Sequence, residues 1–229
     1  MSDPQLTHHI QLEILKRMLN RPESRYSDLK PQHLEANLFV YHLKQLMRLG
    51  LIEKQDKLYI LTRSGKHYAD RVTMESMKIR LQPKIVTVLA IRRSDGKWLM
   101  QVRKQQPFTN YKGFPSGKVH YGETLDVAAT RELQEKAQLT DINLTLRGNI
   151  VMRFNDAEDT INHVIGYVFY GETPATTTVD FDTEYFSSYF ANEADFFLEP
   201  CFAGHQEILA LLKGGRVRFV EEYTFKSAY

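Results

Sequence analysis

The spacing of apolar residues divides the chain into a helical first part and a longer part rich in strands. Over residues 6–20, apolar side chains recur at Ile10, Ile14, Leu15 and Met18, the spacing of one buried helix face. This pattern predicts an amphipathic helix. A short helix over 26–30 and a long one over 34–50 are predicted to follow it.

The long helix has two distinct faces. The residues expected to face the core are Ala36, Phe39, Val40, Leu43, Leu46 and Met47. Those on the opposite, polar face are Asn37, Tyr41, Lys44, Gln45 and Arg48. The short helix before it has Ser27 as its expected N-cap, and Gly50 is the expected end of the long helix.

Beyond Gly50, two strand-like runs flank a polar turn at Asp56, and a helical pattern returns over 64–72. This order resembles the winged helix-turn-helix family over residues 6–72. The resemblance implies that the long helix is the recognition helix and that Lys54 and Lys57 lie on the wing. Its polar face can reach base edges and phosphates, so double-stranded DNA is an expected partner. The alternatives are a solvated helix face or a protein partner.

From about residue 84 the pattern changes to strands with two intervening helices, which predicts an α+β sandwich. The predicted strands are 84–91, 97–104, 144–154, 163–172 and 216–223, and the predicted helices lie within 113–139 and over 205–213. The expected organisation is therefore a first domain over 1–75, a linker over 76–83 and a second domain over 84–229.

Composition adds little to this division. A hydrophobic fraction of 42% and a charged fraction of 25% are typical of globular proteins. The first residues do not resemble a signal peptide, no apolar run is long enough to span a membrane, and Cys201 is the only cysteine. These features predict a cytoplasmic protein. Residues 1–80 carry 14 basic and 9 acidic side chains, and this positive balance favours a polyanionic partner for the first domain.

The segment GFPSGKVHYGETLDVAATRELQEKAQL, residues 113–139, carries the chemistry. After Gly117, five residues lead to Glu123 and seven more lead to Arg131-Glu132, followed by Glu135. This spacing resembles the Nudix box. The resemblance implies an α/β/α sandwich that cleaves nucleoside diphosphate derivatives with Mg²⁺ or Mn²⁺.

Positions 132, 135 and 136 lie at i, i+3 and i+4, so their side chains converge on one helix face. Carboxylates there supply the oxygen ligands that Mg²⁺ prefers, and the bound metal activates water. Glu132 and Glu135 are the candidate metal ligands. By the resemblance, Glu123 and Arg131 complete the catalytic set, with Arg131 orienting the glutamates.

Lys136 departs from the box, where a second glutamate is expected. At about 4 Å and an effective dielectric near 20, a unit charge facing a divalent cation is worth roughly 8 kcal/mol, and lysine reverses its sign. An i,i+4 pair of Lys136 with Glu132 is instead expected to neutralise the acidic cluster. The pocket is then expected to bind a phosphorylated ligand through Lys136, Arg131 and Arg103 without cleaving it.

A carboxylate from a later loop is the alternative that would restore a metal site. The candidates are Glu158, Asp159 and Glu184. Gln138, which replaces a glycine of the box, is expected to change only how the helix ends.

Taken together, the parts resemble Nudix-related transcriptional regulators, although in those the Nudix domain comes first. The resemblance implies a homodimer that binds operator DNA and senses a nucleoside diphosphate-type ligand. The main alternative is an active Mg²⁺-dependent hydrolase whose first domain serves recruitment or dimerisation. An adaptor without a ligand is a third possibility.

Overall fold

The computed structural model describes Leu6 and residues 8–21, 23–73, 75–156, 159–214 and 218–226. The chain forms two compact units, Met1–Leu81 and Gln82–Tyr229. Each has its own hydrophobic core. No helix in the described part of the chain is long and apolar enough to cross a membrane.

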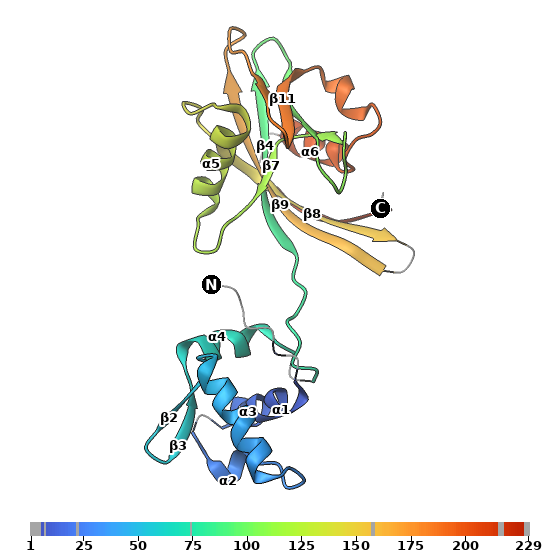
Figure 1. The fold of residues 1–229 in the computed structure, drawn as a ribbon. Coiled ribbons are helices and arrows are strands. Elements are labelled where there is room, and N and C mark those ends of the chain that lie inside the picture. Colours follow the sequence, from blue (N-terminus) through green and yellow to red (C-terminus); the bar gives the residue numbers. More distant parts are fainter. Residues whose placement is uncertain are drawn as a thin grey trace. The chain divides into compact units, whose positions relative to one another are not determined.

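The first unit combines helices with a small antiparallel sheet (Figure 1). The helices are α1 (His9–Leu19), α2 (Tyr26–Leu29), α3 (Ala36–Arg48) and α4 (Arg63–Arg71). The strands are β1 (Ser24–Arg25), β2 (Ile52–Gln55) and β3 (Leu58–Leu61). They pair in the order β1-β3-β2. Asp56, in the turn between β2 and β3, has a φ of 53°, a left-handed conformation that aspartate tolerates.

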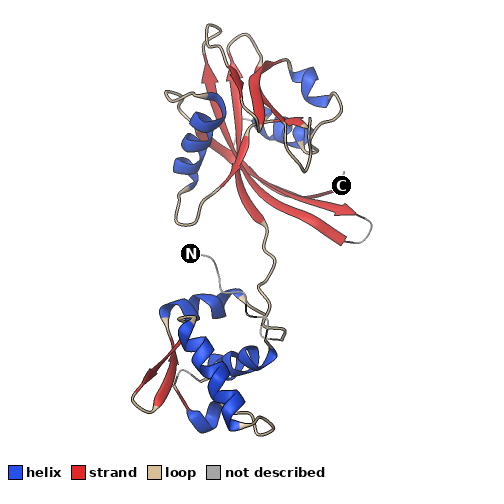
Figure 2. Ribbon diagram, in the orientation of Figure 1, coloured by secondary structure: helices blue, strands red, loops and turns tan. Residues whose placement is uncertain are grey.

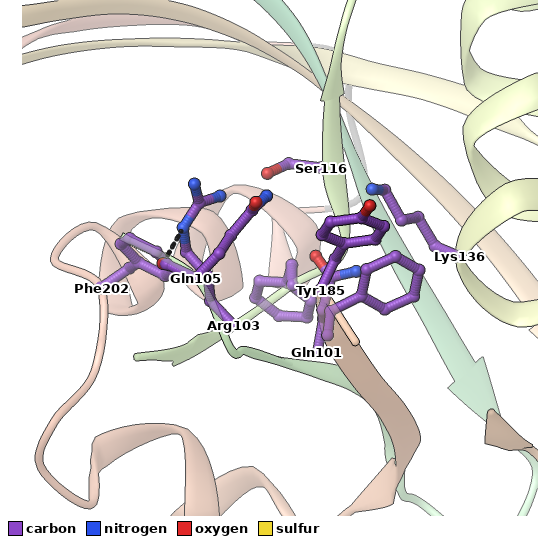
Figure 3. Close-up of a pocket in the computed structure, with 9 residues that line it drawn as sticks. Gln101, Arg103, Gln105, Ser116, Lys136, Tyr185 and Phe202 are labelled. Carbon is purple, nitrogen blue, oxygen red and sulfur yellow. Dashed lines mark hydrogen bonds between the residues drawn. The ribbon is translucent and has the colours of Figure 1, made fainter. Parts of the chain in front are cut away.

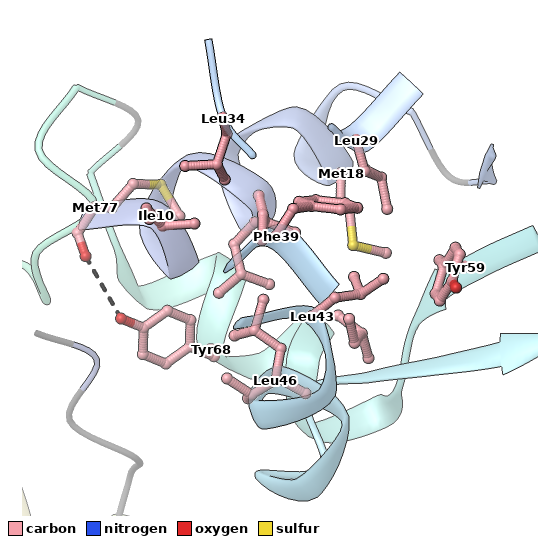
Figure 4. Packing of buried hydrophobic residues seen from close by; sticks show 14 of the residues in the cluster. Ile10, Met18, Leu29, Leu34, Phe39, Leu43, Leu46, Tyr59, Tyr68 and Met77 are labelled. Carbon is pink, nitrogen blue, oxygen red and sulfur yellow. Dashed lines mark hydrogen bonds between the residues drawn. The ribbon is translucent and has the colours of Figure 1, made fainter. Parts of the chain in front are cut away.

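The buried face of α3 differs at its margins from the predicted one (Figure 4). The buried residues are Phe39, His42, Leu43 and Leu46. Successive helix residues are about 100° apart, so this arc includes His42 but leaves Ala36 and Met47 outside it. Ala36 and Met47 are exposed, contrary to the prediction. His42 instead packs against His8, with their ring centroids 4.0 Å apart and their planes tilted by 34°.

Two further details of the first unit differ from the sequence-based expectation. The N-cap of α2 is Arg25, whose backbone N–H donates to the Asp28 carboxylate at 2.9 Å, while Ser27 lies within the helix. Met77, placed in the expected linker 76–83, is only 3% exposed and belongs to the core of the first unit.

The second unit is a mixed sheet with helices on both faces (Figures 1 and 2). Its strands are β4 (Lys84–Arg93), β5 (Trp98–Arg103), β6 (Lys112–Gly113), β7 (Ser116–Lys118), β8 (Thr145–Asp156), β9 (Asp159–Thr173), β10 (Asp180–Asp182), β11 (Phe186–Ala191) and β12 (Arg218–Lys226). Its helices are α5 (Leu125–Ala137), the 3-10 helix η1 (Glu193–Phe197) and α6 (His205–Lys213). The strand order is β10-β11-β5-β4-β9-β8-β12, with β6 on β5 and β7 on β4.

Strand β4 shows how the sheet separates two cores. Leu89 and Ile91 pack in the cluster that contains residues of α5, whereas Val88 and Ala90 pack in the cluster that contains residues of α6. Side chains alternate between the faces of a strand, so a run of apolar residues here indicates burial on both sides. β4 runs parallel to β9 and antiparallel to β7. The observed fold is therefore the α+β sandwich expected for this part of the chain.

His205, at the start of α6, couples the stability of this unit to pH. Its ring is 4% exposed, and Nδ1 lies 3.0 Å from the Phe196 carbonyl oxygen, an acceptor, so Nδ1 carries the proton. Burial lowers the pKa of His205 to about 4.

A folded-state pKa below the ordinary value means that stability is complete above about pH 6.5 and falls as the pH approaches 4. We expect this one group to cost up to about 3 kcal/mol of unfolding free energy across that window. Urea unfolding at several pH values tests it. His205→Asn, which retains a donor for Phe196, should flatten the profile, and an equally steep profile in that variant would contradict the assignment.

Candidate ligand and catalytic site

The box segment folds as a short strand, a loop and a helix. β7 leads into the loop, and α5 begins after Thr124, whose side chain accepts a hydrogen bond from the Val127 N–H at 3.4 Å. At the other end, Gln138 caps α5 with a φ of 57°. This left-handed conformation favours the glycine that the box pattern has at this position.

Arg131 draws the acidic residues of the box together. Its guanidinium donates to both carboxylate oxygens of Glu123, at 2.7 and 2.8 Å. It also donates to Glu132 at 2.6 Å, to Glu135 at 3.3 Å and to the Lys118 carbonyl at 3.1 Å. A planar group with five N–H donors can satisfy such a set at once. The structure therefore brings the predicted Glu123, Arg131, Glu132 and Glu135 into one cluster.

Glu132 lies against the backbone of Gly117. Its side chain is buried, with the residue 4% exposed, and a Cβ on Gly117 would lie 1.7 to 2.0 Å from the carboxylate atoms. Only glycine leaves room for this carboxylate. One of its oxygens, Oε1, is bound by Arg131, while Oε2 is buried without a hydrogen-bond partner in the described part of the chain.

Glu123 is the most strongly held carboxylate of the cluster. The Arg131 guanidinium and the His120 backbone N–H, which donates at 2.9 Å, lower the pKa of Glu123 to about 2. The same contact raises the pKa of Arg131 above its ordinary value. Because the carboxylate is the bound form, this pairing supports the loop above about pH 4.5 and is lost only as the pH falls towards 2.

Lys136 lies apart from the glutamates, contrary to the expected pair with Glu132. Among the described residues it forms no ion pair, and its Nζ lies 4.4 Å from the centroid of the Phe186 ring. Arg131, rather than Lys136, supplies the positive charge that neutralises the glutamates. The ammonium of Lys136 is thus directed to the Phe186 ring rather than to the glutamates of that network.

A cavity of about 390 Å³ opens beside Lys136 (Figure 3). Its lining residues are Gln101, Arg103, Gln105, Phe114, Ser116, Lys136, Tyr185, Phe186 and Phe202. Four of these nine residues are aromatic, and the charged side chains among them are both cations. This volume lies within the range of small-molecule sites, and the lining suits an anion with a planar apolar part.

The predicted ligand residues are divided between the two regions. Arg103 and Lys136 line the cavity, whereas Arg131 belongs to the glutamate cluster. Arg103 is itself engaged, because its Nε donates to the carbonyls of Gln105 and Pro107 at 2.9 and 2.7 Å. Its second terminal nitrogen reaches the Gln106 carbonyl at 3.2 Å. Arg103 therefore holds the loop at the rim of the cavity.

The residues do not fit the metal that the fold implies. Three or more His, Cys, Asp or Glu side chains placed to hold a metal ion are not found in the ranges that the structure describes. Glu123 and Glu132 are engaged by Arg131, and Lys136 brings a positive charge to the position of the expected carboxylate. Of the carboxylates considered as replacements, Glu158 lies outside the described residues. Asp159 begins β9, and Glu184 hydrogen-bonds to Tyr185, raising the pKa of that phenol.

Comparison with known proteins places this geometry in a family. The family model described as NUDIX domain matches residues 81–212, more than half of the chain. The chain belongs to the NUDIX family.

Individual proteins that are similar to this chain were also found. A protein of Methanocaldococcus jannaschii named ADP-ribose pyrophosphatase is 31% identical over 117 residues, which are 49% of this chain and 67% of that protein. The NUDIX domain of Shewanella oneidensis NrtR, solved in complex with ADP ribose, superposes with a TM-score of 0.50 at 14% identity. That match covers 67% of this chain and 98% of the other. A MutT protein from Methanosarcina mazei has a TM-score of 0.47 at 20% identity and covers 59% of this chain and 98% of its own.

Proposed function

We propose that this chain is a DNA-binding regulator whose Nudix unit senses a nucleoside diphosphate-type ligand without efficient cleavage. The observation that carries the proposal is the placement of Lys136. It replaces the expected metal-ligand glutamate, stays outside the Arg131 cluster and lines a cavity with aromatic walls. An ammonium binds a phosphoryl group but does not ligate the metal that activates water.

ADP-ribose is the ligand to test first. The relative from Methanocaldococcus jannaschii is named for its hydrolysis, and the NrtR domain was solved with it. The aromatic walls of the cavity suit a purine, and its cations suit a diphosphate. Isothermal titration calorimetry in EDTA should give saturable binding to the native chain, because Lys136 supplies the positive charge.

The first unit is proposed as a winged helix-turn-helix that binds double-stranded DNA. Its order of helices around the β1-β3-β2 sheet supports this. On α3, Asn37, Tyr41, Lys44 and Arg48 are exposed, and Gln45 is half-buried. On the proposed wing, Lys54 lies over the Tyr59 ring at 5.8 Å, and Lys57 is exposed in the turn. Such a domain reads two half-sites as a homodimer, which sedimentation analysis can test.

The proposed DNA binding of the first unit is tested separately. We expect a fluorescent 30-base-pair duplex to bind with an affinity that falls steeply with salt, because phosphate contacts release counterions. Replacing both Lys44 and Arg48 by alanine should weaken binding by about tenfold or more. Lys16→Ala, an exposed lysine on α1, is the matched control and should change affinity little. Duplex affinity that is independent of salt and of both residues would contradict the proposal.

The second candidate is an active hydrolase. The name of the 31% identical relative favours it, as do the four matched residues Glu123, Arg131, Glu132 and Glu135. Here the first unit would recruit the enzyme or form its dimer. Efficient Mg²⁺- or Mn²⁺-dependent turnover by the native chain would support this candidate over the sensor.

A further inference from the structure

Two polar atoms on neighbouring strands β5 and β11 are buried and have no hydrogen-bond partner in the described part of the chain. Ser188 on β11 is 1% exposed, and its Oγ has no hydrogen-bond partner among the described residues. The Nε2 of Gln101 on β5 is likewise buried and unpartnered, although the Gln101 side chain lines the cavity. A buried donor without an acceptor is costly, and an ion bound beside it is one way in which native proteins satisfy such a group.

The register of the strands brings these two residues together. Ser188 lies directly opposite Gln101, and Phe186 lies opposite Arg103 on the same pair of strands. Residues that are directly opposite share a face and have Cβ atoms about 5 Å apart. Since positions 186 and 188 alternate with 187, Phe186 and Ser188 also share that face.

The third residue is Lys136, which reaches the same face of the sheet from α5. It comes from α5, and its Nζ lies over the Phe186 ring, two residues from Ser188 on β11. Figure 3 shows Gln101 and Lys136 approaching the cavity from different elements, with Tyr185 nearby. An amide NH₂ and a hydroxyl thus lie on facing positions of β5 and β11, and an ammonium from α5 lies over the ring next to them on that face; all three can donate hydrogen bonds.

We propose that Gln101, Ser188 and Lys136 form an inner anion site that binds a phosphoryl group of the ligand without a metal ion. This inference rests on the proposed function and deepens it, because it assigns the anion to residues other than Arg103 and Arg131. Those two guanidiniums already donate to the rim loop and to the glutamates. Donors from three directions suit the non-bridging oxygens of a diphosphate, which point in several directions, better than a planar carboxylate.

The test uses calorimetric titration of the full chain in EDTA with inorganic pyrophosphate and, separately, ADP-ribose. Gln101→Glu keeps the size of the side chain but replaces its donors by a negative charge, so the Kd for both should rise by about tenfold or more. Ser188→Ala and Lys136→Met should also raise the Kd for pyrophosphate. Gln134→Glu makes the same charge change at an exposed position of α5 and should leave both Kd values nearly unchanged.

The possible outcomes distinguish failure of the inner anion site from failure of the sensor proposal. If ADP-ribose binds the native chain and the Gln101 and Ser188 variants equally well but Lys136→Met more weakly, the inner site is wrong while the sensor proposal stands. If Lys136→Met also binds ADP-ribose as well as the native chain, both proposals are wrong. If neither probe binds the native chain, both fall. Binding of glutarate more tightly than pyrophosphate would overturn the phosphoryl assignment. Should Gln101→Glu fail to fold, as judged by thermal melting, Gln101→Met removes the donors without adding charge, and the same comparisons apply.

Discussion

Lys136→Glu is expected to create Mg²⁺-dependent hydrolysis of ADP-ribose at a rate at least about a hundredfold above that of the native chain. The substitution restores the third carboxylate at the i, i+3, i+4 positions of α5 beside Glu132 and Glu135. A metal held there contributes several kcal/mol to transition-state stabilisation, and each 1.4 kcal/mol is tenfold in rate. Release of ribose phosphate from ADP-ribose measures the effect.

Lys136→Met is the matched control for this gain. It removes the ammonium without adding a carboxylate, so it should stay inactive. Mg²⁺ should raise the melting temperature of Lys136→Glu but not that of Lys136→Met, because only the former gains a ligand. Native turnover as fast as that of Lys136→Glu would instead show that the metal site survives the lysine.

Gly117→Ala is expected to destabilise the second unit by about 3 kcal/mol or more. The new Cβ would meet the Glu132 carboxylate at 1.7 to 2.0 Å, so this buried side chain would have to leave its place. Its displacement also breaks the 2.6 Å hydrogen bond from Arg131. Overpacking combined with a lost charged hydrogen bond belongs to the most damaging class of substitution. Chemical unfolding followed by tryptophan fluorescence reports it through Trp98, which is buried in this unit.

Gly122→Ala is the control that distinguishes the steric clash with Glu132 from the general effect of replacing a glycine in this loop. Gly122 has a φ of 83°, and nothing lies within 4 Å of a Cβ added there. Its substitution carries only the left-handed backbone penalty, about 1 kcal/mol. Equal losses at the two glycines would mean that contact with Glu132 does not explain the effect.

Local periodicity was enough to predict the helices and the long strands, because a face buried along a whole element leaves a repeating pattern. Strand β11 was missed: its sequence, FSSYFA, does not alternate apolar and polar residues. The cavity could not be predicted for a related reason. Gln101, Lys136 and Phe186 come from β5, α5 and β11, and only the strand order brings them together.

The arrangement around Lys136 shows how a local rule can fail. The i,i+4 spacing predicts an ion pair between Lys136 and Glu132, one helical turn earlier. Arg131 competes successfully for that carboxylate because its planar group binds Glu123, Glu132 and Glu135 together. A pairwise rule for helix neighbours does not include a donor that serves three acceptors, one of them from the preceding loop.

The hold of Arg131 on three glutamates also bears on how this chain can evolve. The Arg131 side chain holds these carboxylates in place by hydrogen bonds, so their arrangement does not require a metal ion. The codons for lysine and glutamate differ by a single base. One point mutation at position 136 is therefore the shortest genetic path between the proposed receptor and a hydrolase on this scaffold, and the same step can occur in either direction.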